Sequence, residues 1–141
     1  MRGKFDSKGR TKMQGGSPGQ IAHAFVDAIN RQDPAALAGL MTEDHVFIDS
    51  LGARVEGRER MKAGWAGYFK IAPGYTIAVD ETYPAGSVVV MLGIAQGTYG
   101  GEIWQTPAAW RAVIRGSQIA EWRVYADNEP LRALMRQAGL P

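Results

Sequence analysis

Residues Glu43 to Gly57 read EDHVFIDSLGARVEG and place a carboxylate at the end of a short apolar strand. Successive side chains of a strand point to opposite faces, so Phe47 and Asp49 are predicted to share one face. A carboxylate beside an aromatic ring is either hydrogen-bonded or has its pKa raised by desolvation, and a raised pKa suits a general base. The competing interpretation is that Asp49 caps the following Ser50-Leu51-Gly52 turn, a common position for Asp.

Two helices are predicted before this strand. The first begins at Ser17-Pro18, an N-cap followed by a first-turn proline, and ends near Arg31. The second begins at Asp33-Pro34 and is shorter. After the strand, Gly57 opens a third helix that Pro73 stops. The apolar stripe of this third helix is Met61, Trp65, Tyr68 and Phe69.

From Tyr75 onward the apolar period changes from 3.6 to 2, which predicts strands joined by tight turns. The predicted strands are 75–83, 87–94, 102–115 and 118–126, and a closing helix is predicted over 128–137. The strand 87–94 is apolar on both faces, as expected of a central strand with something packed on each side. Pro107 is expected to bend or bulge the long strand around it. This order indicates one α+β domain.

Composition narrows the function classes. The chain has 141 residues, 45% of them hydrophobic, and no cysteine, so disulfides, thiolate metal sites and thiol nucleophiles are excluded. The apolar runs are shorter than a membrane span, which leads us to expect a cytoplasmic protein. Residues 1–20 hold five of the 16 basic and one of the 14 acidic residues. The chain from residue 21 onward therefore has 11 basic and 13 acidic residues. A slightly acidic domain argues against a nucleic-acid partner.

The first 17 residues carry glycines and charges without apolar periodicity. They are interpreted as a flexible basic tail, followed by a single domain over residues 18–141.

Three sequence patterns in this order, ED-x-x-F-x-D-x-x-G, G-R-x-x-M-K and the ending E-W-R-V-Y-A-D, resemble the nuclear transport factor 2-like superfamily. The similarity covers residues 20–137 and is greatest to the SnoaL-like and ketosteroid isomerase-like branch. It implies a cone-shaped roll of the cystatin-like type, in which three helices from the N-terminal half cover one face of a curved, mostly antiparallel sheet. The family fold encloses one deep apolar pocket, and many members are homodimers through the outer sheet face, which implies a homodimer here.

The resemblance bears on activity residue by residue. Asp49 falls on the isomerase Asp that moves a proton between carbons next to a carbonyl. Ketosteroid isomerase pairs this base with an oxyanion hole of a Tyr and a protonated Asp, and the aligned positions here are Phe25 and Ala109, whose side chains cannot donate. Losing one such donor typically costs on the order of 3 kcal/mol in the barrier, so true steroid isomerisation is not expected.

Limonene epoxide hydrolase resembles the Glu121 to Asp127 ending, but its water-activating Asp falls on Val124. Its Arg and Asp of the central strand fall on Leu92 and Ile94, so this chemistry is not expected either. The polyketide cyclases of the SnoaL-like branch, which are similar in being cofactor-free acid-base catalysts, fit the sequence best.

The resemblance and the strand parities together define a candidate site. Asp49 and Asp127 are the candidate catalytic carboxylates, although Asp127 precedes Asn128-Glu129-Pro130 and equally fits a helix cap. The residues predicted to line the pocket are Phe25, Phe47, Trp65, Tyr68, Met91, Ala109, Trp122 and Val124. For each single tryptophan, core or dimer interface is the favoured alternative to ligand contact. Tyr68, Tyr75 and Tyr99 are three hydroxyls between which the sequence does not choose.

No metal site and no cofactor are predicted, because the two histidines are isolated and no Walker loop, G-x-S-x-G elbow or dinucleotide fingerprint is present. Two functions remain open. The first is a cofactor-free isomerase, cyclase or hydrolase in which Asp49 removes a proton from a small apolar carbonyl compound. The second is a non-catalytic module of the same fold that binds a small ligand or a protein.

Overall fold

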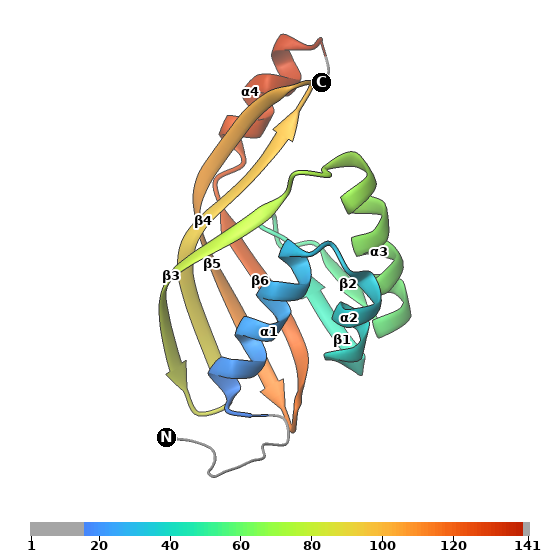
Figure 1. Ribbon diagram of the computed structural model, residues 1–141, viewed down its shortest axis with the longest axis vertical. Coiled ribbons are helices and arrows are strands. Elements are labelled where there is room, and N and C mark those ends of the chain that lie inside the picture. The colour runs from blue at the N-terminus through green and yellow to red at the C-terminus, as the bar shows by residue number, and fades with distance from the viewer. Residues whose placement is uncertain (1–15, 140–141) are drawn as a thin grey trace.

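The computed structural model describes residues 16–139 and contains four helices and a six-stranded sheet (Figure 1). The helices are α1 (Pro18–Asn30), α2 (Pro34–Gly39), α3 (Arg58–Ile71) and α4 (Glu129–Gln137). The strands are β1 (Met41–Ile48), β2 (Arg54–Glu56), β3 (Thr76–Ala85), β4 (Val88–Tyr99), β5 (Glu102–Arg115) and β6 (Gln118–Ala126). Residues 1–15 of the predicted basic tail lie outside the described residues.

The strands form one curved sheet in the order β2-β1-β6-β5-β4-β3. Strands β3 to β6 make an antiparallel meander, and β1 pairs with β6 in parallel. Helices α1 to α3 lie on one side of the sheet, and α4 lies at its end beside β4 and β5 (Figure 1). The predicted fold class, an α+β domain with a curved, mostly antiparallel sheet, is confirmed.

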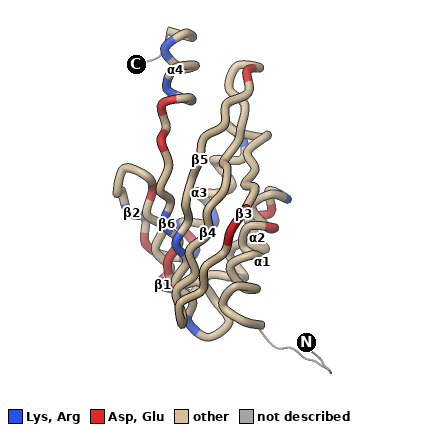
Figure 2. The backbone as a smooth tube through the Cα atoms, turned by 90° about the vertical axis from the view of Figure 1, so that its left-hand side faces the viewer, with Lys and Arg blue, Asp and Glu red and all other residues tan. Residues whose placement is uncertain are grey.

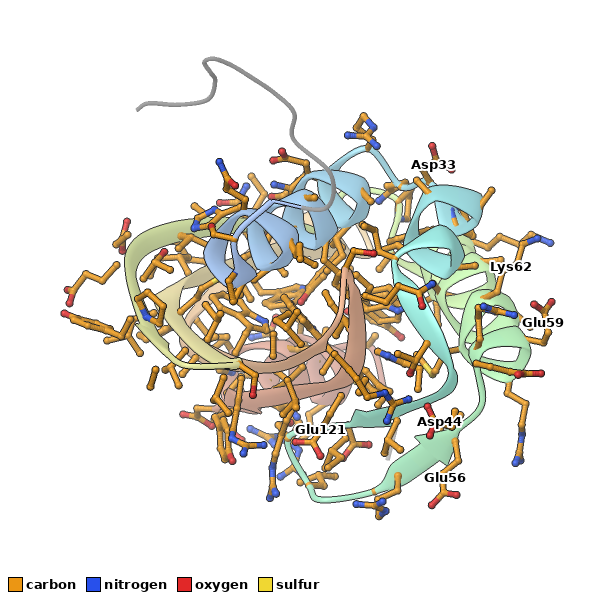
Figure 3. The ribbon with its side chains drawn as sticks, turned by 90° about the horizontal axis from the view of Figure 1, so that it is seen from below. Asp33, Asp44, Glu56, Glu59, Lys62 and Glu121 are labelled. Carbon is orange, nitrogen blue, oxygen red and sulfur yellow. The ribbon has the colours of Figure 1, made fainter. Side chains whose placement is uncertain are left out.

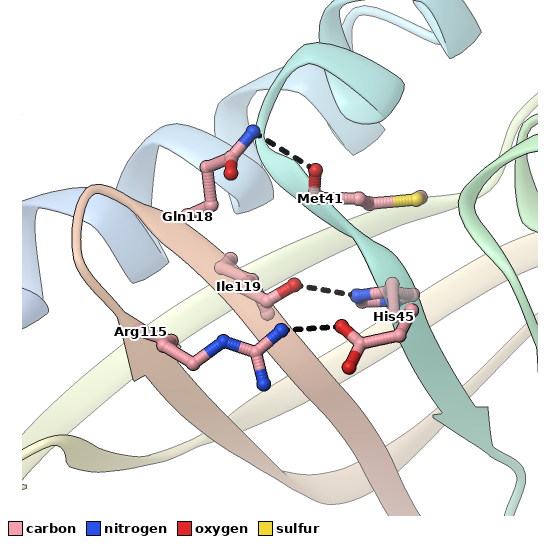
Figure 4. Close-up of polar contacts among 6 residues, drawn as sticks. Met41, His45, Arg115, Gln118 and Ile119 are labelled. Carbon is pink, nitrogen blue, oxygen red and sulfur yellow. Dashed lines mark hydrogen bonds and ion pairs between the residues drawn. The ribbon is translucent and has the colours of Figure 1, made fainter.

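Side-chain hydrogen bonds and an ion pair connect the parallel strands β1 and β6 and the residues next to them (Figure 4). Nδ1 of the buried His45 donates a hydrogen bond of 2.7 Å to the Ile119 carbonyl. The Gln118 amide donates to the Met41 carbonyl at 3.0 Å, and Arg115 forms an exposed ion pair with Asp44. These contacts join segments more than 70 residues apart in the sequence.

The core lies between the helices and the inner face of the sheet. Phe25 of α1 and Trp122 of β6 are fully buried, with ring centroids 4.6 Å apart. Charged side chains such as Asp33, Glu59 and Lys62 point away from this interior (Figure 3). No helix among residues 16–139 has the length and apolar character that crossing a membrane requires.

Pro107 does not bulge β5, contrary to the sequence prediction. The pairing of β5 with β4 runs from Glu102 to Val113 without a register shift, whereas the pairing with β6 begins only at Ala108. Pro107 therefore lies where one edge of β5 has no partner, and its missing N–H leaves no ladder bond unmade. Because the register continues, Trp104 and Trp110 share the inner face, where both are buried.

Two further differences concern strand extent. β2 was not predicted, because three residues of which two are exposed show no readable alternation. β4 continues to Tyr99, beyond the predicted end at residue 94, because Gly97 packs under the Trp104 indole instead of turning the chain. A Cβ on Gly97 would lie 2.8 Å from that ring, so only glycine allows the close approach.

Candidate functional site

A cavity of about 530 Å³ opens at the end of the sheet where β1 and β6 finish and β5 begins. Its size is typical of small-molecule sites. The polar side chains in its wall come mainly from the loop after β1 and from the start of α4; they are Asp49, Ser50, Asn128 and Arg132, with Thr106 from β5. Apart from Gly64, the remaining wall is aromatic or aliphatic; these residues are Phe47, Leu51, Val55, Met61, Trp65, Tyr68, Tyr75, Ala95, Trp104, Val124, Ala126, Leu131 and Met135.

A second hollow of about 470 Å³ lies beside the Arg115–Asp44 ion pair. Its wall is open and largely polar, and the ion pair is exposed. Ligand sites in proteins are concave and mostly apolar with a few polar groups. The apolar cavity beside Asp49 is therefore the candidate site.

Asp49 lies directly after β1, is half-buried and forms part of the cavity wall. Its Oδ1 accepts hydrogen bonds from the backbone amides of Leu51 and Ala53, both at 2.9 Å. Its Oδ2 has no hydrogen-bond partner among residues 16–139. Asp49 thus caps the turn with one oxygen, as the competing interpretation held, and leaves the other oxygen free beside the cavity.

The aromatic side chains of the wall are packed edge to face. Trp65 has its ring centroid 5.9 Å from Phe47 and 6.4 Å from Tyr68, at interplanar angles of 76° and 81°. Tyr68 in turn lies 5.1 Å from Tyr75 at 81°. Such pairs stabilise the fold beyond the area they bury, so this side of the wall is part of the packed structure.

The structure brings five of the ten predicted site residues to the cavity wall. They are Asp49, Phe47, Trp65, Tyr68 and Val124. Strand alternation placed Phe47 and Asp49 on one face, and both line the cavity.

Three predicted pocket residues lie in the core instead. Phe25, Met91 and Trp122 are fully buried and outside the cavity wall. The reason is the position of the cavity along the strands. β4 and β5 contribute Ala95 and Trp104, several residues closer to the end of the sheet than Met91.

Ala109 and Asp127 also lie outside the cavity wall. Ala109 has the opposite parity to the buried Trp110 and lies on the outer face between Leu92 and Tyr125. Asp127 is exposed, and its Oδ1 accepts a hydrogen bond of 3.0 Å from the Glu129 amide at the start of α4. The helix-cap alternative therefore describes its contacts.

The sequence analysis missed the contribution of α4 to the wall. Leu131, Arg132 and Met135 of this helix face the cavity. The Asn128 amide donates a hydrogen bond of 2.8 Å to the Ser50 hydroxyl and so ties the start of α4 to the turn after β1. The signal was the i, i+4 spacing of Leu131 and Met135, which gives α4 an apolar stripe although none of its residues is buried.

In the part of the chain that the structure describes, no three His, Cys, Asp or Glu side chains gather closely enough to hold a metal ion.

Comparison with known proteins shows which protein family and which solved structures this chain resembles. The family model of the SnoaL-like domain matches residues 22–127. A Catenulispora acidiphila protein with a ketosteroid isomerase-like fold, solved in complex with trimethylamine, is 25% identical with a TM-score of 0.75, over 86% of this chain and 94% of that one.

Two further solved structures share the fold at lower identity. A putative SnoaL-like polyketide cyclase of Shewanella denitrificans is 16% identical with a TM-score of 0.75, over 85% of this chain and 97% of that one. An LEH-like epoxide hydrolase of M. tuberculosis is 17% identical with a TM-score of 0.74, over 86% of this chain and 94% of that one. No curated protein matches. Since the family model covers most of the sequence and the fold agrees, the chain belongs to the SnoaL-like domain family.

Proposed function

We propose that this protein is a cofactor-independent acid-base enzyme that acts on a small apolar carbonyl compound, with Asp49 as its general base. The observation that carries the proposal is the position of the Asp49 carboxylate in the wall of an otherwise largely apolar cavity. The names of the similar structures, a polyketide cyclase and an epoxide hydrolase, support small-molecule chemistry on this fold.

The two oxygens of Asp49 have separate tasks in this mechanism. Oδ1 accepts hydrogen bonds from the two turn amides, which hold the carboxylate in place. Oδ2 takes a proton from an acidic carbon of the ligand. The C–H bond breaks, an O–H bond forms, and the electron pair moves to the carbonyl oxygen as an enolate. Return of the proton to another carbon completes an isomerisation. In a cyclisation, the enolate carbon instead attacks a second carbonyl, whose C=O π bond breaks, and the resulting alkoxide takes the proton back from Asp49.

The test is proton exchange in D₂O, followed by NMR on a hexahydronaphthalenone, a bicyclic conjugated enone. We expect wild type to exchange the acidic protons and Asp49→Asn to lose about 100-fold or more of the rate, the usual contribution of general base catalysis. Asn retains the Oδ1 acceptor, so the turn should persist. Asp127→Asn is the matched control, because Asp127 is an exposed carboxylate outside the cavity.

Equal exchange by wild type and Asp49→Asn would contradict the proposal. It would favour the second function, a binding module, for which the observation is the turn-capping role of Asp49. In that case thermal-shift measurements should show ligands that stabilise both proteins equally and that neither protein changes chemically.

We also propose that two copies pair through the outer face of the sheet. Leu92, Ala109 and Tyr125 form one row across β4, β5 and β6, and Leu92 and Tyr125 are 36% and 47% exposed. β4 carries no charged residue along its length (Figure 2). An apolar centre of this kind supports an interface, and sedimentation velocity of the wild type measures the oligomeric state.

A further inference from the structure

Tyr75 is a buried polar residue in the cavity wall whose hydroxyl the fold does not use. The residue precedes β3 and is 8% exposed. Its hydroxyl has no hydrogen-bond partner among residues 16–139, although buried polar groups are normally paired. The residue lines the cavity, so an unpaired hydroxyl there is a candidate for contact with a ligand.

The position of the hydroxyl is fixed by packing. The Tyr75 amide donates to the Ala72 carbonyl at 3.1 Å, which closes the short loop between α3 and β3. The ring lies 5.1 Å from Tyr68 and 6.3 Å from Trp104, and all three residues line the cavity. A ring held between two aromatic neighbours presents its hydroxyl in one place.

No hydrogen bond joins the Tyr75 hydroxyl to another side chain among residues 16–139. The hydroxyl of Thr106, also in the cavity wall, donates to the Pro107 carbonyl at 3.4 Å. The Trp110 indole N–H lies near Tyr75 but falls short of hydrogen-bond geometry, and an indole N–H can only donate. The Tyr75 O–H therefore remains available to a ligand.

The hydroxyl also remains protonated. Burial raises the pKa of Tyr75 far above its ordinary value, and the nearby Tyr68 adds to this, while the Trp110 indole opposes it. Burial likewise raises the pKa of Tyr68. Both hydroxyls are thus neutral donors throughout the physiological pH range.

Tyr75 and Asp49 belong to opposite walls of the cavity. Asp49 follows β1 and Tyr75 precedes β3, and β6, β5 and β4 lie between these strands. Four strand spacings correspond to roughly 19 Å along the sheet surface, and both residues nevertheless line the same cavity. A ligand that contacts both residues spans the cavity.

We propose that Tyr75, assisted by Tyr68, donates the hydrogen bonds that receive the oxygen of the ligand. This pair supplies the donors that the side chains of Phe25 and Ala109 cannot supply. The ligand class is a rigid, apolar conjugated ketone, with its oxygen at the tyrosine wall and its acidic C–H at the Asp49 wall. The inference rests on the proposed function for the cavity as the ligand site, and not on Asp49 acting as a base.

The test compares two probes of nearly equal shape, the hexahydronaphthalenone and the corresponding octahydronaphthalene, which lacks the oxygen. Binding is followed by the fluorescence of the tryptophans in the wall. Tyr75→Phe should weaken enone binding about tenfold, the effect of one lost hydrogen bond, and should leave hydrocarbon binding within twofold. Tyr99→Phe, a half-buried tyrosine outside the cavity wall, should change neither.

Three outcomes would overturn the inference: enone affinity equal in wild type and Tyr75→Phe, equal losses for enone and hydrocarbon, or no binding of the enone to wild type. The thermal midpoint of Tyr75→Phe without ligand provides a fourth test. Removing an unused hydroxyl should leave the thermal midpoint unchanged or raise it, whereas a fall of several degrees would show that the hydroxyl serves the fold.

The two proposals fail separately. Enone binding that depends on Tyr75, without any proton exchange by wild type, overturns only the role of Asp49. Exchange that depends on Asp49, with enone binding unaffected by Tyr75→Phe, overturns only the role of Tyr75.

Discussion

One oxygen of Asp49 holds the turn after β1 and the other is free beside the cavity, so substitutions can separate the turn from the charge. Asp49→Asn keeps an acceptor for the amides of Leu51 and Ala53 and should change the free energy of unfolding little. Asp49→Ala removes both bonds and should destabilise the protein by about 1–2 kcal/mol. Urea denaturation of the three proteins measures the difference. Equal stability of the Asn and Ala variants would contradict the turn-capping role.

His45 makes stability depend on pH. Burial lowers its pKa below the ordinary value of 6.5, because the buried Nε2 has no partner in the described chain. The unfolded state therefore takes up a proton first as the pH falls, and stability should decrease from about pH 7 to pH 5 with a slope of at most about 1.4 kcal/mol per pH unit.

The check is the thermal midpoint against pH for wild type and His45→Asn. Asn can still donate to the Ile119 carbonyl but does not titrate, so its midpoint should vary less between pH 5 and 7. The lowered carboxyl pKa values of Asp44, caused chiefly by Arg115, and of Glu129, caused chiefly by Arg136, act only at more acidic pH. Parallel curves for the two proteins would exclude His45 as the cause.

At the level of residues, alternation in β1 was enough to predict that Phe47 and Asp49 share a face. It could not distinguish core from cavity on that face, because the difference lies in how far along the strand a side chain sits. Met91 and Ala95 have the same parity on β4, yet only Ala95 reaches the cavity. Such a distinction depends on helix packing above the sheet, which single-sequence patterns do not contain.

Among the elements, β4 depends on a glycine at the place where β3 bulges. The β3–β4 register shifts between Val79 and Glu81, and a Cβ on Gly93 would lie 1.9 Å from the Ala78 carbonyl oxygen. Gly93→Ala should destabilise the protein by about 3 kcal/mol or more, because backbone must move to admit the methyl group. Chemical denaturation or loss of soluble expression measures this. A variant as stable as wild type would mean that the bulge adjusts freely.

In helix α3, by contrast, replacing a glycine with alanine should stabilise the protein. Gly67 is exposed within the helix, and a Cβ there would meet nothing within 4 Å. Gly67→Ala should raise stability by about 0.5–1 kcal/mol, because alanine loses less conformational freedom in a helix. Gly39→Ala, at the end of α2 and also without close neighbours, is the comparison for a helix terminus. A loss of stability at Gly67 would contradict this interpretation of α3.

The elements themselves were largely predictable because caps, prolines and glycines mark their ends. Ser17 caps α1 through the predicted N-cap contact with the Gln20 amide. The incorrect predictions concern a proline and a glycine within strands, because the structural effect of either residue depends on its surroundings. Pro107 disrupts a strand only where both edges are paired, and Gly97 continues β4 past the predicted end at residue 94 because the Trp104 indole packs against it. In both cases the deciding partner is distant in sequence.

For the whole molecule, the proposed pairing through the outer sheet face yields a direct prediction. Leu92→Asp places a charge in the apolar row and should shift a dimer to monomers in sedimentation velocity. Ala35→Asp, which puts the same charge on an exposed position of α2, should not. Monomeric wild type, or a dimer unaffected by Leu92→Asp, would contradict the proposed interface.

The parallel pairing of β1 with β6 has a consequence for biosynthesis. β1 is made early, but its central partner is the last strand, and the register joins Phe47 to Trp122. Contacts of this sequence separation slow folding, because a long loop must close before they form. On the ribosome, the cavity wall around Asp49 therefore remains incomplete until both β6 and α4 have emerged, because Leu131, Arg132 and Met135 also belong to it.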